Sequence, residues 1–245
     1  MNLLDVSDLH VNYGRLKAVK GVSFHLKRGE IVGIVGQSGS GKSTIAKTLI
    51  GIEKKSSGKI LLSANSIQMI FQDAVGSLNP RMTIRSTLRE VLQHGKGIKH
   101  SNESIDRRIA TLLSNVGLSE AILNQYPREM SGGQCQRVSI ARALAFDPEI
   151  LIADEPVSAL DVSVQAKVLN LLRQLRDEHN LSILLIAHDL AVVKNICDRI
   201  YVMENGVFVD EGDCDYVFQN PQSEYTKKLL AAVPDVNRGI ISRSM

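Results

Sequence analysis

Residues Gly36–Ser43 read Gly-Gln-Ser-Gly-Ser-Gly-Lys-Ser, and this stretch decides the fold of the 245-residue chain. It matches the phosphate-binding loop pattern of Gly, four residues, Gly-Lys and then Ser or Thr. The three glycines lack a Cβ atom, so the backbone can curl and turn its N–H groups toward an anion. Lys42 adds a positive charge for terminal phosphates, and the Ser43 hydroxyl is a ligand suited to Mg²⁺.

Regular structure is predicted on both sides of this loop. Ile31–Val35 is short, apolar and partly β-branched, which predicts a buried strand. Residues 44–50 are predicted to form a helix that ends at Gly51. A strand, a glycine-rich loop and a helix N-terminus form the arrangement in which a helix end holds phosphate. The alternative is a glycine-rich turn that binds nothing, which leaves the lysine and the hydroxyl unexplained.

The composition is that of an ordinary globular protein. Hydrophobic residues make up 44% and charged residues 22%, and the length allows one large domain or two small ones with a sizeable core. The net charge of +3 comes from 29 basic and 26 acidic side chains, a balance that argues against a nucleic-acid partner. The N-terminal residues include acids and no long apolar run, so no signal peptide is expected.

Cysteine spacing and apolar runs argue against further classes of protein. Cys135, Cys197 and Cys214 are widely spaced and form no Cys-x-x-Cys pair, so neither a disulfide framework nor a zinc site is expected. The spacing of the histidines predicts no transition-metal site. The longest apolar run, near residues 183–187, is far shorter than the about 18 residues of a membrane-spanning helix. If the protein works at a membrane, other chains must span it.

The N-terminal part of the chain is predicted to be rich in strands. Residues 3–11 and 22–26 are predicted strands, and Tyr13 lies between them. Its ring can stack on a nucleotide base or simply pack, and the phosphate-binding loop downstream favours stacking. Residues 59–62 and 67–71 are predicted as two short strands joined by a polar turn, and Gln72 follows the second.

The pattern becomes helical after this region, with predicted loops at 76–80 and 96–102. Buried strands are predicted at 150–153 and 181–187, and a β-hairpin at 201–209. We therefore expect one domain over residues 1–235. Its predicted parts are a core at 1–73 and 146–212, an inserted helical subdomain at about 74–145, C-terminal helices at 213–232 and, beyond the domain, a flexible tail at 236–245.

Polar side chains follow the two predicted buried strands. Asp154 can hold Mg²⁺ through water, and Glu155 can orient or deprotonate an attacking water. A neutral His188 can hydrogen-bond a γ-phosphate or that water. The alternatives are a turn with two solvated acids and a structural histidine. The order of the acids after the phosphate-binding loop favours the catalytic interpretation.

A second glycine-containing segment, Ser131-Gly132-Gly133-Gln134, precedes a predicted helix. Two glycines at a helix start expose backbone N–H groups that can bind an anion. This segment lies about ninety residues from the phosphate-binding loop along the chain, which suggests that it serves the nucleotide of another copy. The alternative is an ordinary glycine-rich helix cap.

Together these motifs resemble the ATP-binding subunit of an ABC transporter, and the resemblance spans nearly the whole chain in the family's order. Tyr13 matches the adenine-stacking aromatic residue, and Gly36–Ser43 matches the Walker A loop. The further matches are Gln72 for the Q-loop, Met130–Gln134 for the ABC signature, Asp154 for Walker B, Glu155 for the catalytic glutamate, Ser158–Asp161 for the D-loop and His188 for the H-loop.

The resemblance implies an α/β P-loop NTPase core with an N-terminal antiparallel β-subdomain and an inserted α-helical subdomain. It implies ATP and Mg²⁺ as ligands. The implied catalytic residues are Glu155, His188 and Gln72, and the implied metal ligands are Ser43, Gln72 and Asp154. The implied nucleotide-binding residues are Tyr13, Gly36, Gln37, Ser38, Gly39, Ser40, Gly41, Lys42, Ser43, Thr44, Ser131, Gly132, Gly133 and Gln134.

The resemblance also implies partners. Family members dimerise head to tail, as homodimers or heterodimers, and Ser131–Gln134 of one subunit closes over the ATP of the other. Two transmembrane permease subunits and, indirectly, an extracytoplasmic solute-binding protein are the further expected partners. The expected location is the cytoplasmic face of the cell membrane, as a peripheral protein.

Finer features resemble the peptide/nickel importer branch. They are Phe71–Asp73, Ser77–Arg81, Glu224–Thr226 and Leu229–Pro234. The chain departs from the usual pattern at Met130 and Val157, and it is shorter than most peptide importer ATPases between Gly58 and Gln72. It lacks the cysteine-bearing tail of some relatives, so no iron–sulfur cluster is expected. Peptide, nickel and metal chelates all remain open as cargo.

Two other kinds of function remain possible at this stage. One is a soluble, non-transport ABC protein acting on DNA or the ribosome, but such proteins usually carry a long coiled coil or a second Walker A, and neither occurs here. The other is a regulatory binder that never hydrolyses ATP, which the presence of Glu155 and His188 disfavours.

Overall fold

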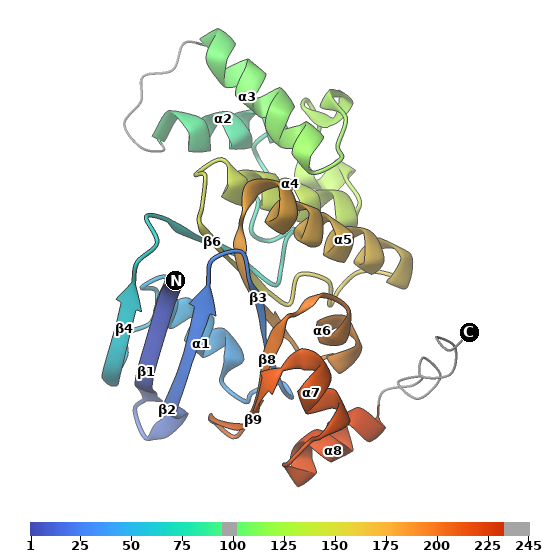
Figure 1. Ribbon diagram of the computed structural model, residues 1–245. Helices are drawn as coiled ribbons and strands as arrows, with labels where there is room; N and C mark the ends of the chain where they lie inside the picture. Colours follow the sequence, from blue (N-terminus) through green and yellow to red (C-terminus); the bar gives the residue numbers. More distant parts are fainter. Residues whose placement is uncertain (95–101, 233–245) are drawn as a thin grey trace, which may run out of the picture.

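The computed structural model describes residues 1–94 and 102–232, and two β-sheets form its frame (Figure 1). The strands are β1 (Asn2–Tyr13), β2 (Leu16–Lys27), β3 (Ile31–Val35), β4 (Ser57–Leu62), β5 (Ile67–Ile70), β6 (Ile150–Asp154), β7 (Ser182–Ala187), β8 (Arg199–Glu204) and β9 (Val207–Asp213). Over the described residues, a three-stranded sheet has the order β2-β1-β4 and a six-stranded sheet the order β5-β6-β7-β3-β8-β9.

Helices cover the six-stranded sheet and form one end of the molecule. They are α1 (Lys42–Leu49), α2 (Ile84–His94), α3 (Asn102–Asn115), α4 (Gly132–Leu144), α5 (Val162–His179), α6 (Leu190–Ile196), α7 (Cys214–Gln219) and α8 (Glu224–Ala231). In Figure 1, α2 and α3 lie at the top, whereas α7 and α8 lie at the bottom beside β9. None of these described helices is long and apolar enough to cross a membrane.

Side chains of the central strands alternate between two hydrophobic clusters. In β3, Val32 and Ile34 pack with α1 and the three-stranded sheet, whereas Ile31 and Val35 pack with the helices on the opposite face. The same alternation runs through β6, β7 and β8. Because both faces are buried, these strands read as continuous apolar runs in the sequence.

The strands predicted around the polar turn at 63–66 exist as β4 and β5, but they belong to different sheets. β4 pairs antiparallel with β1, whereas β5 pairs parallel with β6. The polar link therefore carries the chain from one sheet to the other. Local sequence patterns contain no information on this, because each strand finds its partner far away along the chain.

The parallel strands bring four predicted site residues to one edge of the sheet. β5, β6, β7 and β3 are neighbours and run in the same direction. Gln72, Glu155, His188 and Gly36 come just after the carboxyl ends of these strands, in that spatial order. This is the edge where parallel sheets flanked by helices bind ligands.

The predicted α/β architecture, with an antiparallel sheet and a helical region between β5 and β6, is confirmed. The proposed boundaries of the subdomains stay a prediction. The predicted tail at 236–245 lies outside the described residues, and so does the predicted loop at 96–102 except for Asn102, where α3 begins.

One ion pair joins the loop before β3 to β8. The Arg199 guanidinium donates to the Glu30 carboxylate, with 2.5 Å between Nε and Oε1, and also donates to the His25 carbonyl at 2.9 Å. Burial favours a higher pKa for Glu30, but the hydrogen bonds from Arg199 and from the Lys27 N–H outweigh burial and hold the pKa below its usual value. The ionised carboxylate therefore stabilises the fold.

Replacing Glu30 with glutamine is expected to lower the free energy of unfolding by about 1.5–3 kcal/mol at pH 7, the usual contribution of a hydrogen bond to a charged group. The pKa of Glu30 is lower in the folded protein than in the unfolded chain. The stabilisation by its ionised carboxylate is therefore fully present above the unfolded-state pKa, and it is lost as the pH falls through the folded-state pKa. Urea unfolding at pH 7 and at about pH 3 measures the difference. Glu211→Gln, at an exposed position of β9, is the control. An equal loss at both pH values would contradict the linkage.

Candidate functional site

The phosphate-binding loop connects β3 to α1, as predicted. Gly41 is the N-cap residue of α1 with a φ of +111°, and Gly39 has a φ of +79°. Both values lie in the left-handed region that favours glycine, because a Cβ atom clashes there. The loop can therefore turn sharply enough to start a helix immediately after it.

Gly36 is required for a different reason from the predicted one. Its φ is not positive, but a Cβ atom at this position would lie 2.1 Å from the Met203 carbonyl oxygen. The close approach of β8, rather than backbone curvature, thus excludes any side chain. A Cβ on Gly41 would likewise lie 2.5 Å from the Ala18 carbonyl oxygen.

Lys42 is buried within its own loop. Its ammonium donates to the carbonyl oxygens of Gly36 at 2.7 Å and Gln37 at 2.9 Å. Burial lowers the pKa of Lys42, while the negative charges of Glu155 and Asp154 act in the opposite direction. The ammonium is therefore held by carbonyl groups of the loop, where it is available to an anion entering the loop.

Ser43 and Asp154 meet at the start of α1. The Ser43 hydroxyl donates to Asp154 Oδ1 at 3.0 Å. Burial raises the pKa of Asp154, and the hydrogen bond from Ser43 opposes this rise. Two hard oxygen donors thus lie together beside the phosphate-binding loop, a donor set that fits Mg²⁺. Among the described residues there is no cluster of three His, Cys, Asp or Glu that could hold a metal without further ligands.

Glu155 lies between two of the other predicted site residues. Its Oε2 atom accepts hydrogen bonds from Gln72 Nε2 at 3.1 Å and contacts His188 Nδ1 at 3.1 Å. The Glu155 side chain is only 10% exposed, whereas His188 is 50% exposed. Glu155 also has a φ of +46°, a strained conformation for a non-glycine residue. Such strain is common where a side chain must be placed for a function.

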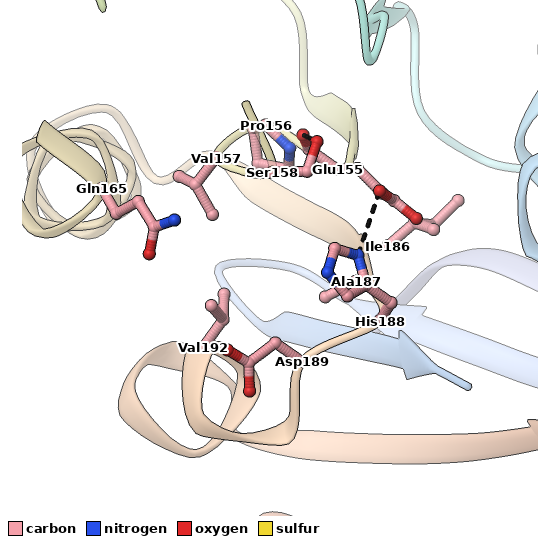
Figure 2. A pocket seen from close by; sticks show the side chains of 10 residues that line it. All are labelled: Glu155, Pro156, Val157, Ser158, Gln165, Ile186, Ala187, His188, Asp189 and Val192. Carbon is pink, nitrogen blue, oxygen red and sulfur yellow. Dashed lines mark hydrogen bonds and ion pairs between the residues drawn. The ribbon is translucent and has the colours of Figure 1, made fainter. Parts of the chain in front are cut away.

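Figure 2 shows the contact between Glu155 and His188 at the side of a small cavity of ≈ 50 Å³. Gln165 of α5 lies across this cavity, and its amide donates to the Leu160 carbonyl at 3.0 Å. Gln165 therefore holds the segment Ser158–Asp161 in place. Gln165 was not among the predicted site residues, because an amide on a helix has no distinctive signature in the sequence.

A larger pocket of ≈ 420 Å³ opens over the phosphate-binding loop. Among the predicted site residues, Tyr13, Ser38, Gly39, Gly41, Lys42, Ser43, Thr44, Gln72 and Glu155 line it. Tyr13 is 42% exposed, so its ring is accessible at the pocket. The size of the pocket is within the range of small-molecule sites.

The turn between β8 and β9 also lines this pocket, through Asn205 and Gly206. The Gly206 N–H donates to the Ser40 carbonyl at 3.0 Å, and the Gly206 carbonyl accepts from the Lys20 N–H at 2.8 Å. The hairpin was predicted, but its contact with the phosphate-binding loop was not. The Asn-Gly pair is an ordinary hairpin signal and says nothing about what the turn touches.

The segment Ser131–Gln134 starts α4 away from this pocket, since none of its residues lines it. The Ser131 hydroxyl accepts from the Gln134 N–H at 3.3 Å, and the Gln134 side chain accepts from the Ser131 N–H at 2.9 Å. Ser131 and Gly132 are exposed. The segment is thus a well-formed helix start on the surface, and within one chain it does not reach the phosphate-binding loop.

A family model described as ABC transporter matches residues 19–158. This range is more than half of the chain and contains the phosphate-binding loop, Gln72, Ser131–Gln134 and both acids after β6. The chain belongs to the ABC transporter ATP-binding family. As members of this family do, this ABC ATPase binds ATP and couples its hydrolysis to transport.

Curated relatives share almost half of their residues with this ABC ATPase. The oligopeptide transport ATP-binding protein OppF of Salmonella typhimurium is 46% identical, over 95% of this chain and 78% of that protein. The protein of the same name from Bacillus subtilis is 44% identical, over 95% of this chain and 82% of that protein. The likeness therefore extends across nearly the whole ABC ATPase.

Solved structures agree with the fold. The structure of cbiO1 from Clostridium perfringens, part of the ABC transporter complex cbiONQ, superposes with a TM-score of 0.79 at 30% identity, covering 89% of this chain and 91% of that one. The ATP-binding cassette MJ0796, as a dimer in a post-hydrolysis state bound to ADP and phosphate, gives a TM-score of 0.77 at 29% identity, covering 86% and 98%.

Proposed function

We propose that this chain is the ATPase subunit of a membrane importer for oligopeptides, and that its pocket over the phosphate-binding loop holds MgATP. The observation that supports this most directly is the convergence of Lys42, Ser43 and Glu155 on one pocket. The resemblance to oligopeptide transport ATP-binding proteins supports the choice of cargo. Nickel and metal chelates, the other cargo expected from the sequence, have no such support and stay a prediction.

ATP binding begins with the phosphates. Backbone N–H groups of the loop and of the first turn of α1 face an anion placed over the loop, and the helix dipole favours negative charge there. Lys42 donates to two carbonyl groups of its own loop, and phosphate oxygens offer its ammonium a stronger electrostatic partner. Tyr13 offers an exposed ring for the adenine.

Ser43, Asp154 and Gln72 are the proposed residues that hold Mg²⁺, and Ser43 and Gln72 both line the pocket. Their oxygen atoms suit this cation, which usually keeps some water and phosphate oxygens as ligands. When bound, Mg²⁺ neutralises charge that develops on the phosphate oxygens. The burial of Asp154 supports this assignment, since a bound cation offsets the cost of burying a carboxylate.

Glu155 is the proposed residue that orients and activates the attacking water. Gln72 and His188 both contact its Oε2 atom, which limits the directions that the carboxylate can take. His188, whose Nδ1 atom contacts the Glu155 carboxylate, is the proposed residue that contacts the terminal phosphate. Positioning of this kind lowers the barrier because the water, the base and the phosphate need no further ordering.

A second ATPase subunit, identical or related, completes the proposed site. Ser131 and Gly132 are exposed, and no residue of Ser131–Gln134 lines the pocket of its own chain, so this helix start can serve the nucleotide of the partner. The dimeric structure of MJ0796 supports such an assembly. Two permease subunits, a solute-binding protein outside the cell and a location at the cytoplasmic face of the membrane complete the proposal.

Replacement of Lys42 by alanine tests the proposed nucleotide site and transport function together. Loss of a charged hydrogen bond of about 1.5–3 kcal/mol predicts that the Kd for MgATP rises about 10- to 100-fold. Uptake of a labelled oligopeptide into vesicles that contain the full transporter should fall in parallel at ATP concentrations below the new Kd. Isothermal titration calorimetry and a vesicle uptake assay measure the two effects.

Lys59→Ala, which removes an exposed lysine of β4, is the control and should change neither quantity. Unchanged ATP affinity in Lys42→Ala would overturn the proposed nucleotide site. ATP-dependent uptake of nickel instead of peptide would overturn the proposed cargo. Hydrolysis stimulated by DNA or ribosomes but not by permeases would favour the soluble, non-transport alternative.

A further inference from the structure

We infer that Tyr225 of α8 is a positioning residue for the phosphate-binding loop, so that the C-terminal helix sets the affinity for ATP. The inference rests on the nucleotide site proposed above. The Gln37 backbone N–H donates to the Tyr225 hydroxyl at 2.9 Å, although the two residues are 188 positions apart. Neither residue lines the pocket. Tyr225 therefore acts on the loop and not on the nucleotide.

The backbone of Gln37 is held at both its N–H and its carbonyl group. Its carbonyl accepts from the Lys42 ammonium at 2.9 Å and from the Ser40 N–H at 3.2 Å, while its N–H goes to Tyr225. Two of these partners belong to the loop itself and move with it. Tyr225 is the partner of Gln37 from outside the loop, and together with the bond from the Gly206 N–H to the Ser40 carbonyl it holds the loop against the rest of the domain.

The position of Tyr225 is itself fixed by β9. The buried Asp210 carboxylate accepts from the N–H groups of Gln222 at 3.1 Å and Ser223 at 2.9 Å, just before α8 begins. The Ser223 hydroxyl then caps α8 by accepting from the Tyr225 N–H at 3.1 Å. This chain of contacts leads from the edge strand of the large sheet to the phenol of Tyr225.

The helix is also held by apolar packing. Tyr225, Leu229 and Leu230 pack against the hydrophobic cluster beneath the helices. Thr226 is fully buried, so α8 cannot leave the surface without exposing it. The hydroxyl of Tyr225 is thus presented by a helix with little freedom, as a positioning contact requires.

The contact gains importance when ATP is bound. If Lys42 turns to the phosphates, the Gln37 carbonyl loses one of its two donors. The hydrogen bond from the Gln37 N–H to Tyr225 then carries a larger part of the restraint on the start of the loop. A loop held in its binding conformation loses less entropy when the ligand arrives, and its affinity is correspondingly higher.

Tyr225→Phe tests the inference in the full chain, because it removes only the hydroxyl. The loss of one neutral hydrogen bond predicts that the Kd and KM for MgATP rise about 2- to 10-fold, while kcat changes less than twofold. The exchange rate of the Gln37 amide proton, measured by hydrogen exchange without nucleotide, should increase. Tyr216→Phe is the matched control, since Tyr216 is 59% exposed on α7.

A second variant reaches the same contact from a distance. Asp210→Asn weakens the two bonds that fix the start of α8 and should raise the Kd for MgATP in the same direction. Unchanged Kd in both variants, with unchanged Gln37 exchange, would overturn the inference. A parallel loss of kcat and thermal stability without a selective rise in KM would also overturn it, because it would indicate only a structural role.

Lys42→Ala, measured beside these variants, separates the two proposals. If Lys42→Ala weakens ATP binding and Tyr225→Phe does not, the nucleotide site stands and the positioning role fails. If Lys42→Ala binds ATP normally, the nucleotide site itself fails, and the role of Tyr225 fails with it.

Discussion

Glu155→Gln is expected to lower the kcat for ATP hydrolysis by about 10²–10⁴-fold, the usual contribution of a positioned general base. The Kd for MgATP should change little, because the amide has the size of the carboxylate and the phosphate contacts come from the loop. The amide cannot accept a proton from water, and it also changes the hydrogen bonds with Gln72 and His188. Phosphate release and nucleotide binding measure the two quantities separately.

Glu178→Gln is the matched control, since it makes the same substitution at an exposed position of α5. It should leave hydrolysis and binding unchanged. A second expectation follows for Glu155→Gln: with hydrolysis blocked, ATP-bound dimers should accumulate and elute earlier in size-exclusion chromatography. Near-normal turnover in Glu155→Gln would reject the assigned role, even if the variant bound ATP as tightly as the wild type.

Ser131→Arg is expected to abolish ATP-driven dimerisation and to lower hydrolysis by about 10²–10³-fold, as loss of a transition-state donor does. Ser131 is exposed at the start of α4, and it does not line the pocket over the phosphate-binding loop of the same chain. A guanidinium side chain there leaves the single subunit folded but blocks the surface that must close over a partner's nucleotide. ATP binding to the single subunit should therefore remain.

Ser131→Arg also removes the N-cap of α4, so a control must separate the loss of the cap from the block of dimerisation. Ser131→Ala removes the hydroxyl that accepts from the Gln134 N–H without adding bulk, and the loss of such a cap costs about 1 kcal/mol. Ser114→Arg adds the same side chain to an exposed position of α3. Dimers and hydrolysis that persist in Ser131→Arg at wild-type level would refute the composite site.

Much of the site was predictable because its residues follow elements with strong local signals. The strand Ile31–Val35 and the glycine-rich loop after it were predicted where the structure has them. Asp154 and His188 were selected because each follows an apolar run, and β6 and β7 are indeed parallel neighbours. In a parallel sheet, the carboxyl ends of the strands meet at one edge, so the order of motifs along the chain already implies their proximity.

Other features could not be predicted from local patterns. The reason why Gly36 must be glycine is the carbonyl oxygen of Met203, which lies in a strand far along the chain. The separation of β4 and β5 into two sheets depends on which distant strand each one pairs with. Gln165 carries no signature in the sequence, because amides on helices are common. Tyr225 lies in the stretch Glu224–Thr226 that resembles the importer branch, but nothing in that stretch indicates that its hydroxyl reaches Gln37.

The amino-acid pattern alone was sufficient for the family, the α/β architecture and the candidate chemistry, because a glycine-rich loop, a lysine and strand-end acids are needed together for phosphate chemistry. The folded chain was needed to show that Gln72 and His188 hold Glu155, and that Gln37 hydrogen-bonds to Tyr225. Local propensity acts over a few residues, whereas these contacts join residues that become neighbours when the strands pair and the helices pack.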